Sequence, residues 1–132
     1  MNMAKQTYDI ETLFKALADR TRLRLINLIG ESEVCVCFLV EILKTSQPKI
    51  SRHLAYLRRA RIVTARREGK WMHYRLAEPP DEHAAKIFRE VRESLIEHPA
   101  FQRDRQKLDQ VCCAVQLPIQ LRHAPKPMAA VG

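Results

Sequence analysis

Residues 46–77 combine a helical pattern with a β-hairpin pattern, and this combination restricts the possible folds more than any other feature of the chain. Ser46 suits the start of a helix, and Pro48 in the first turn costs no hydrogen bond. A narrow apolar stripe then follows at helical spacing: Ile50, Leu54 and Leu57. Two short β-type runs, 62–67 and 71–76, come next with a glycine turn between them. The order predicts a helix docked by one face, followed by a two-stranded hairpin.

The same segment carries the whole net charge. The 132-residue chain has 23 basic and 15 acidic side chains, a formal net charge of +8. Residues 46–77 hold nine of the basic side chains against Glu68 alone, whereas residues 1–45 and 78–132 are each neutral. A concentrated basic block implies a polyanionic partner, most simply nucleic acid. The alternative is a solvated basic face on a small α+β domain.

The flanking regions read as helices. Helical spacing covers about 10–17, 21–29 and 35–43, with Asp19 as a cap and 31–34 as a connector. A further helix, about 82–98, follows the hairpin and ends before Pro99. We therefore expect a mainly α fold with a small β-hairpin wing, a winged helix-turn-helix. Its domains would be a DNA-binding and dimerisation domain over 1–98, a helical extension over 99–117 and a loose tail over 118–132.

A winged helix-turn-helix binds duplex DNA with its basic helix and its hairpin. The major groove admits one α-helix, and basic residues at a hairpin tip suit phosphates or a minor groove. The residues expected to contact DNA lie on the helix (Gln47, Lys49, Ser51, Arg52, His53 and Tyr56) and on the hairpin (Arg66, Arg67 and Lys70).

The four cysteines form two pairs, Cys35 with Cys37 and Cys112 with Cys113. Two thiols at positions i and i+2 of an ideal helix point apart. They could share one ion only if the first helical turn were unwound, which would disturb the helix beneath the basic helix. Soft thiolates favour thiophilic centres such as trivalent arsenic or antimony. The alternative is that these cysteines are small buried core residues.

Four motifs together resemble the arsenic-responsive repressors of the ArsR/SmtB family. They occur in order over about residues 10–77: Thr21–Leu25, Cys35–Cys37, Ser46–Leu54 and Gly69–Leu76. The resemblance implies a homodimeric repressor that binds operator DNA and leaves it when an inducer binds. It also implies that the first and fifth helices form the dimer interface. An apolar stripe on the fifth helix suits such pairing, or ordinary core packing: Ala84, Phe88, Val91 and Leu95.

The sequence departs from the family pattern for arsenite at one position. That pattern has a third cysteine three residues after the second, where this chain has Val40. Cys112 or Cys113 could complete the site, within a subunit or across the dimer. The second pair could instead form a separate dithiol site for monosubstituted organoarsenicals, which need only two sulfurs. The predicted metalloid ligands are therefore Cys35, Cys37, Cys112 and Cys113.

These features predict a metalloid-responsive repressor with trivalent arsenic or antimony as inducer and no organic cofactor. The alternatives are a thiol-based redox-sensing repressor and a constitutive DNA-binding protein without effector. The sequence offers no nucleophile–base constellation, phosphate loop or carboxylate pair that would indicate an enzyme. It also has no apolar run near the roughly 20 residues of a membrane helix, and no signal-peptide core. We expect a cytoplasmic protein without a membrane partner.

Overall fold

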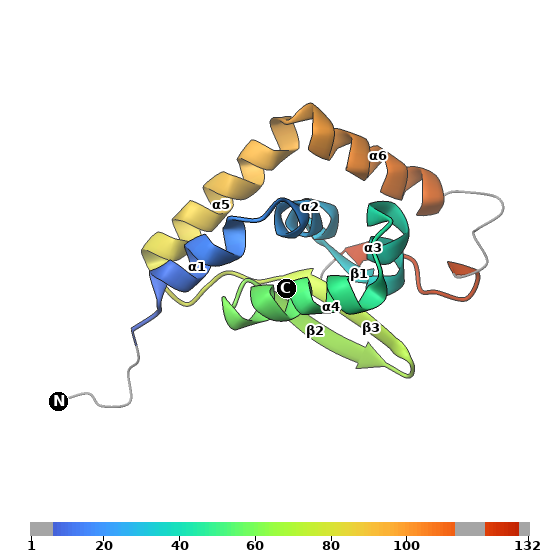
Figure 1. Ribbon diagram of the computed structural model, residues 1–132, viewed down its shortest axis with the longest axis horizontal. Helices are drawn as coiled ribbons and strands as arrows, with labels where there is room; N and C mark the ends of the chain where they lie inside the picture. The colour runs from blue at the N-terminus through green and yellow to red at the C-terminus, as the bar shows by residue number, and fades with distance from the viewer. Residues whose placement is uncertain (1–6, 113–120, 130–132) are drawn as a thin grey trace.

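The computed structural model describes residues 7–112 and 121–129. Helices surround α2, and a β-hairpin wing projects from the body (Figure 1). The elements in chain order are α1 (Ile10–Leu17), α2 (Arg20–Ile29), β1 (Ser32–Cys35), α3 (Val36–Leu43), α4 (Gln47–Arg59), β2 (Val63–Glu68), β3 (Trp71–Leu76), α5 (Glu82–Glu97), α6 (Pro99–Cys112) and β4 (Met128–Ala129). The predicted fold class, mainly α with a hairpin wing, is confirmed. Over the described residues, no helix is long and apolar enough to cross a membrane.

Aspartates set where three of the helices begin. Asp9, Asp19 and Asp81 each precede a helix and accept a hydrogen bond from a backbone N–H in its first turn. The predicted cap at Asp19 is thereby confirmed. Gly30 ends α2 with φ at 54°, a left-handed conformation that glycine adopts without steric strain.

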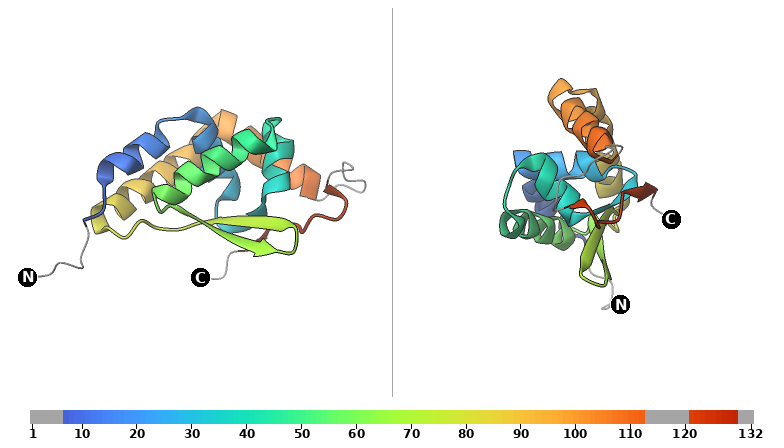
Figure 2. Two further views of the ribbon diagram at one scale, coloured as in Figure 1. Left: turned by 60° about the horizontal axis from the view of Figure 1, so that its bottom comes forward. Right: turned by 90° about the vertical axis from the view of Figure 1, so that its right-hand side faces the viewer.

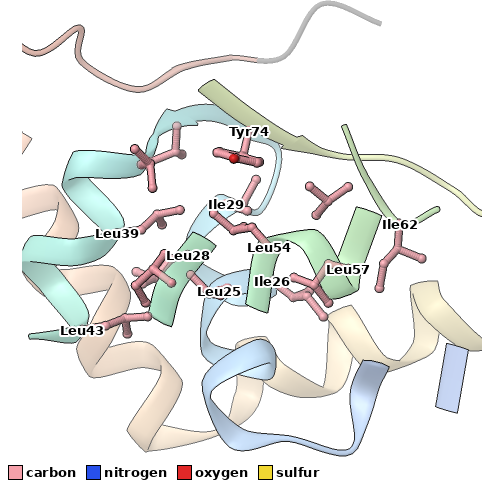
Figure 3. Packing of buried hydrophobic residues seen from close by; sticks show 14 of the residues in the cluster. Leu25, Ile26, Leu28, Ile29, Leu39, Leu43, Leu54, Leu57, Ile62 and Tyr74 are labelled. Atoms are coloured by element: carbon pink, nitrogen blue, oxygen red, sulfur yellow. The ribbon is translucent and has the colours of Figure 1, made fainter. Parts of the chain in front are cut away.

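The core is built on α2, whose apolar side chains meet those of α3 and α4 (Figure 3). The predicted stripe on α4 is confirmed, since all three of its members are 0% exposed: Ile50, Leu54 and Leu57. Burying a side chain of this size contributes about 1.5–3 kcal/mol. Apolar packing therefore holds α4 by one face and leaves much of its remaining surface exposed.

The sheet has the strand order β2-β3-β1-β4. The wing hairpin is in continuous antiparallel register from Val63 opposite Leu76 to Glu68 opposite Trp71. Residues 31–34, expected to be a connector, largely belong to β1, which pairs with β3. A four-residue strand has too few residues to show an alternation, and its partner lies about 40 residues away in the sequence, so local pattern does not reveal it.

The end of the chain differs from the expected loose tail over residues 121–129. Leu121 is 0% exposed and Ala124 is 8% exposed, and both belong to the core cluster. Met128 pairs with Glu33, so β4 covers the outer edge of β1. An uncovered strand edge exposes unpaired backbone groups, and this pairing satisfies some of them.

The helical extension packs on the body of the protein. α6 packs against α2 after the chain turns at Pro99 (Figures 1 and 2). The Arg24 guanidinium donates two hydrogen bonds to the Asp104 carboxylate, at 2.7 and 3.0 Å. Asn27 donates to the Phe101 carbonyl at 2.9 Å. Asp104 is only 4% exposed, so the helix is fixed by a half-buried ion pair as well as by apolar contacts.

The apolar stripe of α5 is mostly used within the chain. Ala84 and Phe88 are 0% exposed and Leu95 is 5% exposed, which matches core packing rather than helix pairing. The exposed large apolar side chains on α1 and α5 are instead Ile10, Phe14 and Ile96. Helical spacing indicates that a face is covered, and it does not indicate whether the same chain or a partner covers it.

Replacing the buried carboxylate tests the attachment of α6. Asp104→Asn should lower the free energy of unfolding by about 2 kcal/mol, because it leaves the Arg24 guanidinium without its charge partner. Urea denaturation at a fixed protein concentration measures the change. The control Asp109→Asn, on the exposed side of the same helix, should change it by less than about 0.5 kcal/mol. Equal effects of the two variants would contradict this assignment.

Candidate nucleic-acid interface and thiol site

α4 lies beside the wing on one side of the molecule (Figures 1 and 2). Its exposed side chains include several polar and basic ones. Pro48 lies in its first turn, as predicted, while Ser46 occupies the cap position without a side-chain hydrogen bond to the helix. Of the predicted DNA contacts on α4, three are exposed and Ser51 is half-buried. The three exposed residues are Gln47, Lys49 and Arg52.

His53 and Tyr56, also predicted DNA contacts, are half-buried against Arg22 of α2. The Arg22 guanidinium carbon lies 4.1 Å from the centre of the Tyr56 ring, and its Nη1 lies 3.3 Å from His53 Nδ1. Arg22 also donates to the Ala16 and Lys15 carbonyls at the end of α1. One guanidinium thus links α1, α2 and α4. Sequence reasoning missed this role because the contacts join residues 31 and 34 positions apart.

The three predicted contacts on the wing are all exposed, and one of them is engaged. Arg66 donates two hydrogen bonds to the Glu33 carboxylate, at 2.6 and 3.1 Å, and this holds the pKa of Glu33 below its usual range. Lys70 lies near the wing tip, with its Nζ 5.0 Å from the centre of the Trp71 ring. Arg67 and Lys70 therefore offer their charges outward, whereas Arg66 ties β2 to β1.

The first cysteine pair lies where β1 passes into α3. Cys35 is the last residue of β1 and the cap of α3, with extended backbone angles of −68° and 141°. Cys37 is in the first turn, and its Sγ lies 2.8 Å from that of Cys35. The expected divergence of the two thiols does not arise, because Cys35 precedes the helix. No unwinding of α3 is needed to bring the sulfurs together.

The two thiols differ in acidity. The hydrogen bond from the Cys37 thiol, followed by its backbone N–H and the charge of His73, lowers the pKa of Cys35 to about 6 against the opposing effect of burial. The pKa of Cys37 is raised, first by that shared hydrogen bond and then by burial. These opposite shifts in pKa favour a thiolate at Cys35, with the proton kept at Cys37. A thiolate is the form of cysteine that binds soft metals and metalloids.

His73 stands opposite Cys35 in the pairing of β1 with β3. It is 3% exposed, and its Nε2 lies 2.8 Å from Glu68 Oε1. His73 is not among the predicted site residues, because its neighbourhood depends on β1 being a strand. The one sequence feature that could have indicated the place of His73 beside the thiol pair is a pattern of β-type residues flanking Cys35.

The described part of the chain places no third metalloid ligand beside Cys35 and Cys37. Within residues 7–112 and 121–129, no group of three or more histidine, cysteine or acidic side chains could hold a metal ion. Cys112 is half-buried on the last turn of α6, a helix that contacts α3. Cys113 lies outside the described residues.

A helical core that presents a basic helix and a basic β-hairpin defines a winged-helix DNA-binding protein. The profile of the "Bacterial regulatory protein, arsR family" matches residues 19–65. The "Arsenical resistance operon repressor" of Escherichia coli K12 is 53% identical over 80 residues, which cover 60% of this chain and 68% of that protein. The chain belongs to the arsR family of DNA-binding transcriptional regulators, which agrees with the expectation that it is not an enzyme.

Two further relatives extend the comparison. The "Arsenic resistance transcriptional regulator ArsR1" of Pseudomonas putida KT2440 is 58% identical over 65 residues, 48% of this chain and about half (51%) of that protein. Among solved structures, the homodimeric winged helix-turn-helix domain of a possible ArsR-family regulator from Mycobacterium bovis is 29% identical with a TM-score of 0.53. The match covers 74% of this chain and 97% of that one.

The contacts of Arg22 predict that this side chain stabilises the fold, although it lies outside α4. Arg22→Ala should lower the free energy of unfolding by about 2–3 kcal/mol, because two bonds to α1 carbonyls and the stacking on Tyr56 are lost. Urea denaturation measures it, with Lys15→Ala on the exposed face of α1 as the control. A change of less than about 0.5 kcal/mol in Arg22→Ala would show that this linkage is not stabilising.

Proposed function

We propose that this protein is a transcriptional repressor that binds operator DNA as a homodimer and is released by trivalent arsenic or antimony at Cys35 and Cys37. The observation that carries the proposal is the pair of sulfurs 2.8 Å apart at the start of α3, the helix that directly precedes α4. The names of the Escherichia coli and Pseudomonas putida relatives support arsenic resistance as the setting.

DNA binding would use α4 in the major groove and the wing on the flanking backbone. Gln47, Lys49 and Arg52 are exposed on α4, and Arg67 and Lys70 are exposed on the wing. Such side chains donate to base edges and phosphates, and their charge makes binding salt-dependent. A symmetric dimer would place two copies of α4 on half-sites about one helical turn apart.

The homodimer is supported by the apolar side chains that the chain leaves exposed on α1 and α5. Phe14 is 52% exposed and Ile96 is 64% exposed, although both are large and apolar. Covering them would remove apolar surface from water, which favours association. The related Mycobacterium bovis domain is described as homodimeric, which supports the same assembly here.

The thiol pair has the chemistry and nearly the spacing that a trivalent metalloid needs. Two thiolates that share a metal ion at about 2.3 Å, the distance known for zinc, stand about 3.5–3.8 Å apart. The sulfurs of Cys35 and Cys37 would therefore separate by about an ångström from their present 2.8 Å. Each thiol that joins arsenite forms one As–S bond and displaces one hydroxyl, which leaves as water with the thiol proton.

Cys112 or Cys113 would supply a third sulfur from the same subunit. Cys112 is half-buried on α6, which contacts α3, and Met128 pairs with Glu33 two residues before Cys35. α6 and β4 of the same subunit therefore lie against the elements that carry the first pair. A monosubstituted arsenical would need no third sulfur. Such a thiol site requires reduced cysteines, which supports a cytoplasmic location.

A redox sensor is the second candidate, and the same 2.8 Å separation favours it. A peroxide could accept two electrons as the Cys35 and Cys37 thiols lose their protons and form a disulfide of about 2.05 Å, yielding an alcohol and water. Release of DNA by peroxide, reversed by a reductant, without any response to arsenite would favour this candidate over the metalloid.

Cysteine variants test the proposed function directly. Fluorescence anisotropy would follow binding to a labelled duplex that covers the DNA upstream of the coding sequence. Arsenite should weaken binding of the unmodified protein by about 5- to 150-fold. Cys35→Ser should bind the duplex with unchanged affinity and show no response to arsenite, because the first sulfur is missing.

The remaining variants complete this experiment. Cys37→Ser should behave like Cys35→Ser. Of Cys112→Ser and Cys113→Ser, the variant with the weaker response to arsenite identifies the residue that supplies a third sulfur. An exposed serine that is not in the site, Ser94→Ala, serves as the control and should respond to arsenite as the unmodified protein does. Normal arsenite release of Cys35→Ser would overturn the proposal, and so would DNA binding that no thiol ligand affects.

A further inference from the structure

We propose that His73 is a positioning residue that carries the effect of ligand binding at Cys35 directly to the tip of the wing. This inference rests on the proposed function and adds the route within the protein. The route runs through the sheet, from β1 to the β2–β3 hairpin, rather than only along the chain from α3 to α4. Three observations carry it: the strand register, the contacts of His73, and an ion pair that spans the same strands.

The register places three residues in one row across the sheet. Cys35 on β1 is opposite His73 on β3, and His73 is opposite Arg66 on β2. Residues directly opposite each other in antiparallel strands project from the same face, with Cβ atoms about 4.5–5.5 Å apart. The side chain of Cys35 therefore has the His73 ring as its immediate neighbour in the sheet.

His73 reaches from this row to the wing tip. Its Nε2 lies 2.8 Å from Glu68 Oε1, and Glu68 pairs with Trp71 in the last pair before the Gly69–Lys70 turn. The ring is 3% exposed, so the surrounding chain confines its movement. A displacement of Cys35 that moves the His73 ring must also move or break its contact with Glu68.

A second connection joins the same strands. Glu33, two residues before Cys35 and on the same side of β1, accepts two hydrogen bonds from Arg66 of β2. Two connections on the same face of the sheet therefore tie β1 to the wing: the Glu33–Arg66 pair and the Cys35–His73–Glu68 contacts. A shift of β1 cannot leave the hairpin in place without breaking one of them.

The position of Cys35 explains why the sheet carries the signal. Cys35 belongs to β1 and not to the body of α3, and its sulfur is already beside that of Cys37. Ligand binding that separates the two sulfurs therefore acts on the end of β1, where Cys35 is fully buried, as well as on the first turn of α3. The wing carries Arg67 and Lys70, so its displacement would weaken phosphate contacts first.

The protein contains a built-in reporter for this movement, since its single tryptophan, Trp71, lies at the wing tip opposite Glu68. Addition of saturating arsenite to the DNA-free protein should change the Trp71 emission. His73→Phe keeps an aromatic ring but cannot bind Glu68. In that variant the emission should not respond, although calorimetry still detects arsenite at the stoichiometry of the unmodified protein.

The same variants are then tested on DNA. Saturating arsenite should weaken binding of His73→Phe by less than about threefold, against the 5- to 150-fold expected for the unmodified protein. His73→Gln, whose amide can still donate to Glu68, should recover much of the response. A merely structural role for His73 would not give this rescue. The exposed His83→Phe on α5 is the matched control and should respond fully.

The outcomes separate this inference from the proposed function. If the unmodified protein binds arsenite and stays on DNA, the proposed function fails. If it is released and His73→Phe is released equally, with an unchanged Trp71 response, the route through His73 is refuted. Should His73→Phe not fold, as judged by circular dichroism, Glu68→Ala removes the hydrogen-bond acceptor at an exposed position, and full coupling in that variant would also refute the route.

Discussion

The antiparallel pairing of β1 with β3 is the contact on which the arrangement of the thiol site and the wing depends. It sets Cys35 beside His73 and leaves the end of β1 to act as the cap of α3. One residue thus belongs both to the sheet that leads to the wing and to the helix that leads to α4. Without β1 as a strand, the two cysteines would lie on one helix with their sulfurs apart.

The distribution of charge divides the chain by role. Outside residues 46–77, acidic and basic side chains balance, and several of them pair within the fold, as Arg24 does with Asp104. Inside that segment only Glu68 is acidic, and Arg66 finds its partner on β1 instead. Lys49, Arg52, Arg67 and Lys70 of the segment are exposed. They are available to a polyanion, and the family to which the chain belongs binds DNA.

The sequence was enough to predict those elements that are marked by residues close together in the chain. The stripe Ile50, Leu54 and Leu57 predicts how α4 docks, Asp19 predicts the start of α2, and the turn at Gly69 predicts the hairpin. The first cysteine pair is also apparent from spacing. These features depend on propensity and periodicity, which the sequence displays directly.

Other features depend on contacts between distant residues, and pattern alone does not reveal them. β1 needs its partner β3 to be a strand, His73 gains its neighbours only through that pairing, and Arg22 contacts α4 from α2. Likewise, the spacing of Ala84 and Phe88 shows that one face of α5 is covered without showing that the same chain covers it.

The central claim is that the thiol pair and the DNA-binding surface are energetically coupled, and reciprocity gives the most direct test. If arsenite weakens DNA binding by a given factor, bound DNA must weaken arsenite binding by the same factor. Calorimetric titration of arsenite into the protein, with and without saturating operator duplex, measures this second factor. We expect the same 5- to 150-fold weakening. Equal arsenite affinity in the presence and absence of DNA would contradict it.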